Sequence, residues 1–94
     1  MRNKVKRKSK YYVYIVRCKN GTYYAGYTNN LDNRIKEHNS GHGAKYLKGK
    51  LPVKLVFAKE YKYYMNTLRA ERNLKKLTRK DKEILIKIYE KEKA

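Results

Sequence analysis

Two neighbouring stretches near the start of the chain consist almost entirely of aromatic and β-branched residues. They run over 11–17 and 22–27, and the pair Asn20-Gly21 lies between them. Aromatic and β-branched side chains favour strands, and an Asn-Gly pair supplies the positive φ that a tight connecting turn requires. The pattern therefore predicts a β-hairpin.

A short helix is predicted after the hairpin, from about Leu31 to Asn39. Gly41 follows it and can end it, because glycine readily adopts the left-handed conformation found just beyond a helix. Three residues before the helix can cap its N-terminus: Thr28, Asn29 or Asn30.

The second half of the chain predicts a loop, a third strand and two helices. Segment 40–52 is rich in glycine and lysine and is expected to be a cationic loop, and a strand is predicted over 53–59. Asn66 can cap the first of the two helices, and Thr78 with Asp81 resembles a capping box for the second. Their apolar positions are Leu68, Leu74 and Leu77 in the first helix and Ile84, Leu85 and Ile88 in the second.

This order of elements predicts a small α/β domain, β-β-α-β-α-α, in which a three-stranded sheet is flanked by helices. A helix-containing connection leads to the third strand, so we expect that strand to run parallel to one neighbour and the sheet to be mixed. The domain is expected to span residues 11–90. Residues 1–10 contain six Lys and Arg and no acid, which predicts a flexible basic arm, and residues 91–94 form a short tail.

The charge of the chain narrows the class of partner. The formal net charge is +18, from 26 Lys and Arg against 8 Asp and Glu. Such a surplus indicates a polyanionic partner, and we expect nucleic acid, with DNA ahead of RNA. An anionic membrane is the alternative, but it requires a basic amphipathic helix, whereas the apolar residues here are divided among several short segments. We therefore expect no membrane association.

The single cysteine, Cys18, excludes a disulfide within the chain and leaves no cysteine pair for a structural zinc. No apolar run approaches the roughly 18 residues of a membrane span, and the stretch 11–16 is too short for a secretory signal. These features predict a cytoplasmic location.

Arg34 and His38 are the first candidates for chemistry. They lie four residues apart on the predicted helix, so their side chains are neighbours and can address one phosphate together. The alternative is that both are ordinary solvated residues of a helix whose apolar side is Leu31 and Ile35.

Glu71 is the acid whose position is least ordinary. It lies three residues from both Leu68 and Leu74, on the apolar stripe of its helix. A carboxylate there is costly unless a cation meets it. That cation is either a Lys or Arg in a salt bridge or a hard divalent metal such as Mg²⁺ or Mn²⁺, for which one or two protein carboxylates suffice. Glu71 is therefore the candidate metal ligand.

Tyr14 and Tyr24 lie on the two adjacent strands of the hairpin, in a chain with 11 Tyr, one Phe and no Trp. The alternative to a catalytic role is that such rings pack in the core and expose their hydroxyls. Gly26 leaves room for backbone or substrate to approach closely, and Lys45 and Lys48 in the cationic loop are the expected substrate-binding lysines. Four other tyrosines could stack unpaired bases: Tyr11, Tyr23, Tyr27 or Tyr46.

Taken in order, these residues resemble the GIY-YIG nuclease domain, and within it the small stand-alone bacterial branch. The resemblance spans about residues 11–80, and the stretch from His38 to Val53 is similar to the stand-alone branch in particular. The usual first glycine of the first motif is Tyr12 here, and Ala25 stands in the middle of the second motif. The residues that carry the resemblance are Val13-Tyr14, Tyr24-Ala25-Gly26, Arg34, His38 and Glu71.

The resemblance implies metal-dependent hydrolysis of a phosphodiester. By the family pattern Glu71 holds the cation, Arg34 binds the scissile phosphate, and Tyr14 and Tyr24 line the site with His38 close by. One tyrosine in such sites takes the proton from the attacking water. Free tyrosine titrates near a pKa of about 10, so this role requires a nearby cation, and the base stays open among Tyr14, Tyr24 and His38.

The leading hypothesis is a metal-dependent endonuclease acting on DNA, related to repair or recombination. It would bind mainly through phosphates and be directed by DNA structure or by a protein partner that supplies specificity. One alternative is a non-catalytic module that binds structured RNA or DNA and retains the nuclease fold. Another is a scaffold whose basic arm docks an acidic protein.

Overall fold

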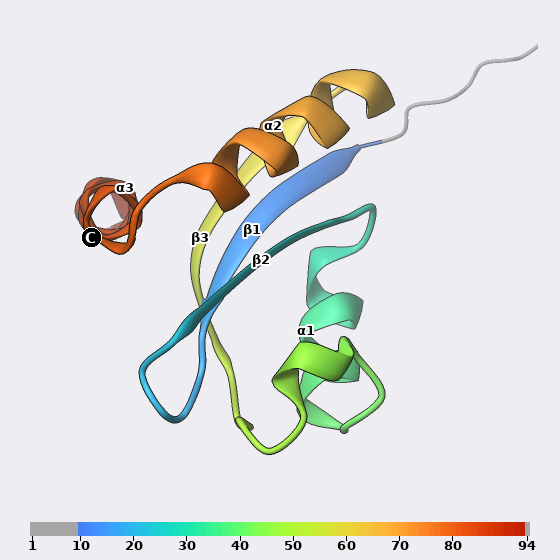
Figure 1. Ribbon diagram of the computed structural model, residues 1–94. Coiled ribbons are helices and arrows are strands. Elements are labelled where there is room, and N and C mark those ends of the chain that lie inside the picture. The colour runs from blue at the N-terminus through green and yellow to red at the C-terminus, as the bar shows by residue number, and fades with distance from the viewer. Residues whose placement is uncertain (1–9, 94) are drawn as a thin grey trace, which may run out of the picture.

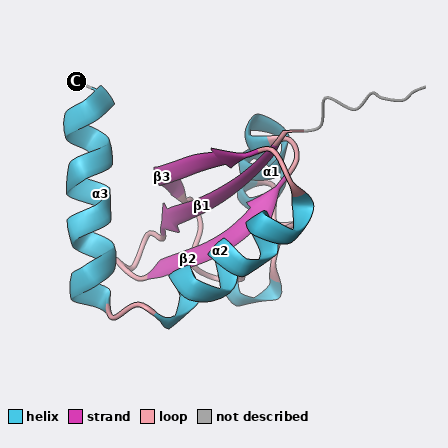
Figure 2. Cartoon of the chain, turned by 90° about the horizontal axis from the view of Figure 1, so that it is seen from above, coloured by secondary structure: helices cyan, strands magenta, loops and turns pink. Residues whose placement is uncertain are grey.

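The structure, a computed structural model, describes residues 10–93. A three-stranded sheet lies between helices, with α1 on one face and α2 on the other (Figures 1 and 2). The elements in chain order are β1 (Tyr11–Arg17), β2 (Tyr23–Thr28), α1 (Leu31–Asn39), the 3₁₀ turn η2 (Lys45–Leu47), β3 (Lys54–Tyr61), α2 (Tyr64–Lys76) and α3 (Arg79–Lys93).

The predicted order of elements and the three-stranded sheet flanked by helices are confirmed, but the expected mixed sheet is wrong. The strand order is β2-β1-β3, and β1 pairs antiparallel with both neighbours. β2 and β3 do point the same way, as a helix-containing connection requires, yet β1 lies between them and no parallel pair forms.

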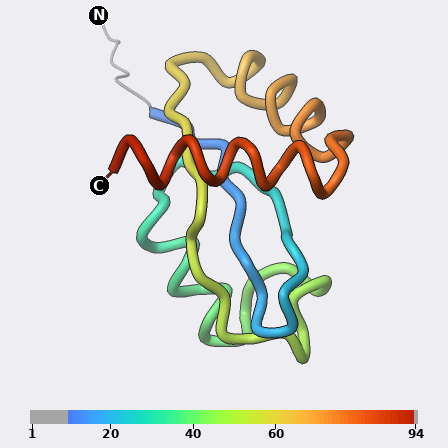
Figure 3. Tube along the Cα trace, turned by 90° about the vertical axis from the view of Figure 1, so that its left-hand side faces the viewer, coloured from blue at the N-terminus to red at the C-terminus, as the bar shows by residue number. Residues whose placement is uncertain are grey.

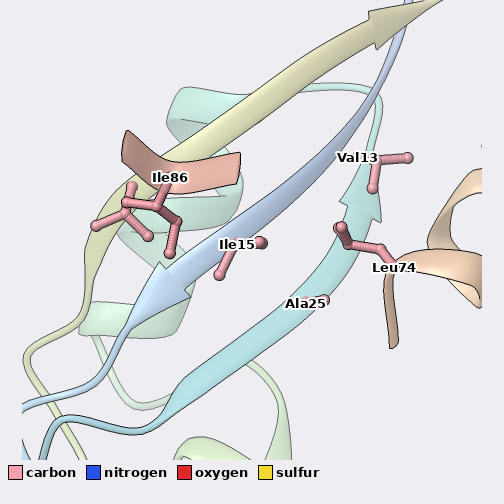
Figure 4. Packing of buried hydrophobic residues seen from close by; sticks show 6 residues of the cluster. Val13, Ile15, Ala25, Leu74 and Ile86 are labelled. Atoms are coloured by element: carbon pink, nitrogen blue, oxygen red, sulfur yellow. The ribbon is translucent and has the colours of Figure 1, made fainter. Parts of the chain in front are cut away.

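β1 is the central strand, and both of its faces are buried. Val13 and Ile15 face α2 and α3, where they form one core with Ala25, Leu74 and Ile86 (Figure 4). The alternate residues Tyr14 and Val16 of β1 face α1 and form a second core on the opposite side, together with Cys18 just after the strand and with Leu47 and Val53. Because successive side chains on a strand point to opposite faces, a strand covered on both sides is apolar throughout, which explains the unbroken run at 11–17.

α3 crosses the strands and packs on β3 (Figure 3). Ile86 is its buried residue, whereas Ile84 and Ile88 are each 50% exposed. The expectation that Ile84, Leu85 and Ile88 form the inner side of this helix therefore holds only for Leu85, which packs against the core.

Two of the predicted helix caps are present. The Asn33 N–H donates to Asn30 Oδ1 at 3.1 Å, and the Asp81 N–H donates to Thr78 Oγ1 at 3.1 Å. Each bond satisfies a backbone donor that has no partner inside its helix.

The cap predicted at Asn66 is wrong, because α2 begins two residues earlier, at Tyr64. The Thr67 N–H and the Thr67 hydroxyl both donate to the Tyr63 carbonyl, at 3.1 and 2.8 Å, and so draw the residues before Asn66 into the first turn.

Asn39 fastens the end of α1 to the start of β3. Its side-chain amide donates to Val53 O at 3.1 Å and accepts from Val53 N at 2.7 Å, as a strand neighbour would. These two bonds hold α1 and the segment that follows it against the same face of the sheet as Tyr14. Over residues 10–93, no helix is long and apolar enough to cross a membrane.

Candidate active site

Tyr14 and His38 form a buried hydrogen-bonded pair between β1 and α1. The distance from Tyr14 Oη to His38 Nε2 is 2.7 Å, and the two residues are 1% and 0% exposed. His38 is the buried residue of α1, so the helix directs an imidazole at the sheet where an aliphatic side chain would be usual. The alternative of a solvated histidine is wrong.

Two glycines make room for this pair. A Cβ at Gly26 would lie 2.7 Å from Tyr14 Oη, and a Cβ at Gly43 would overlap His38 Nδ1 and lie 2.8 Å from His38 Cα. The reason for glycine is therefore steric at both positions. The close approach expected at Gly26 is found, and the group that approaches is the Tyr14 hydroxyl. The sequence did not single out Gly43, because glycine is common in loops and its contact with His38 arises only in the folded chain.

The hydrogen bond at Nδ1 of His38 indicates which ring nitrogen carries the proton. The Ala44 N–H donates to His38 Nδ1 at 3.4 Å, and burial, together with the charge of Arg34, lowers the pKa of His38. The imidazole is thus neutral at pH 7, and because Nδ1 accepts, Nε2 carries the proton and donates it to Tyr14 Oη.

Arg34 lies beside the same hydroxyl. Its guanidinium and the Tyr14 phenol each shift the other's pKa through a hydrogen bond and through charge, while Arg34 Nη1 donates to Glu37 Oε1 at 3.1 Å. The Arg34 side chain is 31% exposed, so part of the guanidinium remains available to a ligand. Glu37, which the sequence did not single out, therefore orients Arg34 from one turn further along α1.

The Tyr14 hydroxyl is affected by several of the predicted site residues. Burial raises the pKa of Tyr14 to about 12, Arg34 acts to lower that pKa, and the charges of Tyr24 and Glu71 act to raise it. Charges interact appreciably only when they are close. Tyr24 of β2, Arg34 of α1 and Glu71 of α2 therefore lie in the neighbourhood of Tyr14.

Tyr24 connects this centre to the surface. Its ring meets the His38 ring edge-on, with centroids 5.7 Å apart, and stacks on Tyr46 with centroids 5.6 Å apart. Tyr46 is 48% exposed, and Lys50 Nζ lies 4.1 Å from the centroid of its ring. Tyr24 and Lys50 both contact the Tyr46 ring, and the base stacking considered for this residue stays a prediction.

Glu71 lies near the centre and also forms an ion pair. Its side chain is 18% exposed, and Oε2 is 3.4 Å from Lys75 Nζ one turn along α2. The hydrogen bond with Tyr64 raises the pKa of Tyr27, and the charge of Glu71 raises it further, as it does at Tyr14. α2 packs on β2, and the charge of Glu71 acts on tyrosines of both β1 and β2. Because the Lys75 side chain is 51% exposed, this ion pair contributes little to stability.

The donor set around Glu71 suits one kind of metal. Among the described residues, no group of three or more His, Cys, Asp or Glu side chains could hold an ion, which does not match a structural zinc site. Mg²⁺ takes one or two carboxylates and keeps several waters, and a single carboxylate such as Glu71, whose side chain is 18% exposed, fits that pattern.

Lys45 and Lys48 are exposed and lie on the other side of His38. Both line a cavity of about 370 Å³ that also contacts Gly43, and neither lines the cavity beside Arg34. Their part in substrate binding stays a prediction.

Comparison with known proteins identifies a family to which the chain is similar. Residues 10–84 match the model of the GIY-YIG catalytic domain. The UPF0213 protein YazA of Bacillus subtilis is 49% identical over 76 residues, which cover 81% of this chain and 77% of that protein. A UPF0213 protein of Halobacterium salinarum is 41% identical over 75 residues, covering 80% of this chain and 97% of that one.

Two solved structures are also similar, both determined by solution NMR. The first, a UPF0213 protein of Bacillus halodurans, has a TM-score of 0.56 at 43% identity over 84% of each chain. The second, from E. faecalis, has a TM-score of 0.60 at 36% identity over 92% of each chain.

Proposed function

The chain belongs to the GIY-YIG catalytic domain family, and we propose that it is a metal-dependent endonuclease that hydrolyses phosphodiester bonds of DNA. The observation that carries this proposal is the buried Tyr14–His38 pair, with the Tyr24 ring against His38 and the charges of Arg34 and Glu71 acting on Tyr14. A phosphate-binding cation, a carboxylate and a proton acceptor at one point are what this hydrolysis needs.

Arg34 binds the scissile phosphate in this proposal. A guanidinium offers several N–H donors in a fixed plane, and Glu37 takes one of them at 3.1 Å. The remaining donors can reach phosphate oxygens and stabilise the charge that develops on them.

Tyr14 is the proposed base, and its pKa sets a condition on the reaction. With a pKa of about 12, ionising Tyr14 at pH 7 costs about 7 kcal/mol, at ~1.4 kcal/mol for each pKa unit. A divalent cation held by Glu71 would supply an acidified water and a positive charge close to the phenol. Without such a charge the tyrosine stays protonated, which is the physical reason to expect metal dependence.

His38 acts as a positioning residue. Both of its ring nitrogens have partners, Nε2 the Tyr14 hydroxyl and Nδ1 the Ala44 N–H, so we give it no direct contact with substrate. Its Nε2 proton, directed at Tyr14 Oη over 2.7 Å, fixes the phenol and stabilises the phenolate once the proton has left. Among the three residues that the sequence left open, this contact favours Tyr14 as the base.

The test is a nicking assay on supercoiled, branched and single-stranded DNA with Mg²⁺ or Mn²⁺, and with EDTA. Glu71→Ala and Arg34→Ala should each lower cutting at least ~100-fold, as loss of a transition-state contact does. Glu90→Ala removes the same charge from an exposed position on α3 and should cut like the unaltered protein. Lys75→Ala should also cut, since it frees the Glu71 carboxylate. Full activity of both Glu71→Ala and Arg34→Ala would contradict the site assignment.

A second candidate is a non-catalytic module that binds structured DNA or RNA. The ion pair between Glu71 and Lys75 and the burial of Tyr14 favour it, because a carboxylate already paired and a shielded phenol are also compatible with an architectural role. Salt-sensitive binding without metal-stimulated cutting on any DNA or RNA form would support this candidate over the nuclease. A role in repair or recombination, and a protein partner that directs the site, remain proposals under either candidate.

A further inference from the structure

A cavity of about 500 Å³ lies beside Arg34 and is lined by residues from the start of β1, the end of β2, α1 and the first turn of α2. Figure 1 shows these segments near one another at its upper right. Three tyrosines from three of these elements form part of its wall: Tyr11, Tyr27 and Tyr64. Asn29 and Asn33 add side-chain amides, and Arg34 connects the cavity to the proposed phosphate site. The volume is within the range of pockets that hold small ligands.

The three rings pack as one aromatic group. The Tyr64 ring lies 5.6 Å from that of Tyr11 and 6.0 Å from that of Tyr27, and the hydroxyls of Tyr27 and Tyr64 are 3.2 Å apart. Tyr64 nevertheless remains 44% exposed, so part of its ring is open to a ligand. The rings therefore hold one another in place while presenting aromatic surface to the cavity.

The charge of the cavity differs from that of the molecule. The chain carries 26 Lys and Arg, yet in the described part of the chain no lysine lines this cavity, and its one guanidinium, Arg34, is paired with Glu37 at 3.1 Å. The Glu37 carboxylate repels a phosphate from the interior, whereas Arg34 attracts one to the rim. A ligand that places a neutral aromatic ring inside the cavity and a phosphate at its rim fits both the Glu37 carboxylate and the Arg34 guanidinium.

Amide side chains suit the edge of a nucleobase. Asn29 and Asn33 are exposed, and within residues 10–93 no hydrogen bond involves their side-chain amides, whereas Asn30 Oδ1 is used by the helix cap. An amide offers both donors and an acceptor, as base edges do, and aromatic side chains stack on base faces.

We propose that this cavity binds one unpaired nucleobase of a DNA strand whose adjoining phosphate lies at Arg34. The inference rests on the proposed function and names its substrate class: strands with an unpaired nucleotide next to the site of cutting. A paired base in a duplex is stacked between its neighbours and does not enter such a cavity unless it is first extruded.

The test measures binding with EDTA present, so that it does not depend on cutting. Fluorescence anisotropy compares a single-stranded oligonucleotide with a strand of equal length whose residues are abasic, which preserves the phosphates and removes the bases. The unaltered protein should bind the base-bearing strand more tightly, on the order of tenfold, as stacking of one base provides. Tyr64→Ala should remove most of this preference, and Tyr64→Phe, which keeps the ring, should retain it.

Tyr63 provides a matched control. It is the neighbouring tyrosine, 63% exposed, and it does not line the cavity, so Tyr63→Ala should keep the preference for bases. A second variant, Asn33→Tyr, adds bulk to the cavity from an exposed helical position and should reduce the preference without affecting the core. Thermal melting of each variant verifies that it is folded.

Equal affinity of the unaltered protein for the two strands would overturn the proposal. So would equal losses in Tyr64→Ala and Tyr63→Ala, or a loss in Tyr64→Ala that is as large for a blunt duplex as for the single strand. A base preference that depends on Tyr64 without any cutting would support the cavity and contradict the nuclease, and cutting without such a preference would do the reverse.

Discussion

The buried imidazole of His38 should make the stability of the protein depend on pH in a defined window. Burial lowers the pKa of His38 in the folded protein, whereas an unfolded histidine titrates near a pKa of about 6.5. As the pH falls below that value, the unfolded chain takes up a proton that the folded protein does not, so stability is complete above pH ~6.5 and declines below it.

The size of the effect follows from linkage. Each pH unit between the folded and the unfolded pKa lowers the free energy of unfolding by at most ~1.4 kcal/mol. Between pH 7.5 and pH 5.5 the loss is therefore at most about 1.4 kcal/mol. A chain of this length loses roughly 4–8 °C in Tm per kcal/mol. Carboxylates titrate mainly below this pH range, so a change in stability between pH 7.5 and pH 5.5 is attributed to histidine.

The assay is urea denaturation at pH 7.5, 6.5 and 5.5, and the chain supplies its own control. His42 is the other histidine and is exposed in the loop after α1. His42→Gln should keep the loss of stability in acid, and His38→Gln should lack most of it. NMR of the unaltered protein reports the same quantity directly, since the His38 ring should titrate below the ordinary value of about 6.5 and show the proton on Nε2.

Two results would refute this reasoning. One is a His38 ring that titrates at or above the ordinary value of about 6.5. The other is a loss of stability in acid that persists in His38→Gln and disappears in His42→Gln.

Three further predictions concern the residues that build the site. Tyr14→Phe should abolish metal-dependent cutting while changing the free energy of unfolding by only about 1–2 kcal/mol, since it removes one buried hydrogen bond and keeps the ring. Gly26→Ala should destabilise by about 1–3 kcal/mol and lower cutting, because the new methyl group meets Tyr14 Oη at 2.7 Å. Asn39→Ala should destabilise by about 1–3 kcal/mol, because it removes both bonds to the Val53 backbone, and urea denaturation measures each of these changes.

Each of these has its own control or contrary outcome. Tyr12→Phe removes a hydroxyl from the preceding residue of β1 and should cut normally; equal loss in both tyrosine variants would argue against a specific role for Tyr14. Gly26→Ala with unchanged stability and activity would mean that the ring moves aside freely. If Asn39→Ala leaves stability unchanged, the end of α1 is held by other contacts.

The sequence predicted those features of the fold that arise from neighbouring residues. The Asn20-Gly21 turn and the cap residues Asn30 and Thr78 act within a few positions of the chain, and the structure has them where they were expected. Gly21 has φ +88°. Sheet pairing is not local in this sense. The helix-containing connection from β2 to β3 predicted that these two strands run in the same direction. It did not predict which strand pairs with β3, because only the packing of the whole chain makes β1 the central strand.

For the candidate site, sequence patterns identified candidate residues but not which of them contact one another. Tyr14, Arg34, His38 and Glu71 could be named from order and spacing; the fold then pairs His38 with the Tyr14 hydroxyl and brings the charges of Arg34 and Glu71 to act on it. Gly43 could not be named, since its role is to avoid a clash with a side chain of the preceding helix.

The sequence by itself determined the elements, the basic character and the set of reactive side chains, because propensity, charge and residue chemistry belong to each residue or its near neighbours. Only the tertiary structure decided that Tyr14 and His38 are buried and paired, that Glu71 lies on a helix covering the other face of the sheet, and that three tyrosines line a cavity that no lysine of residues 10–93 lines. The physical reason is that burial and electrostatic coupling depend on distances between segments far apart in the chain, which are set by how two layers of helices close over a single sheet.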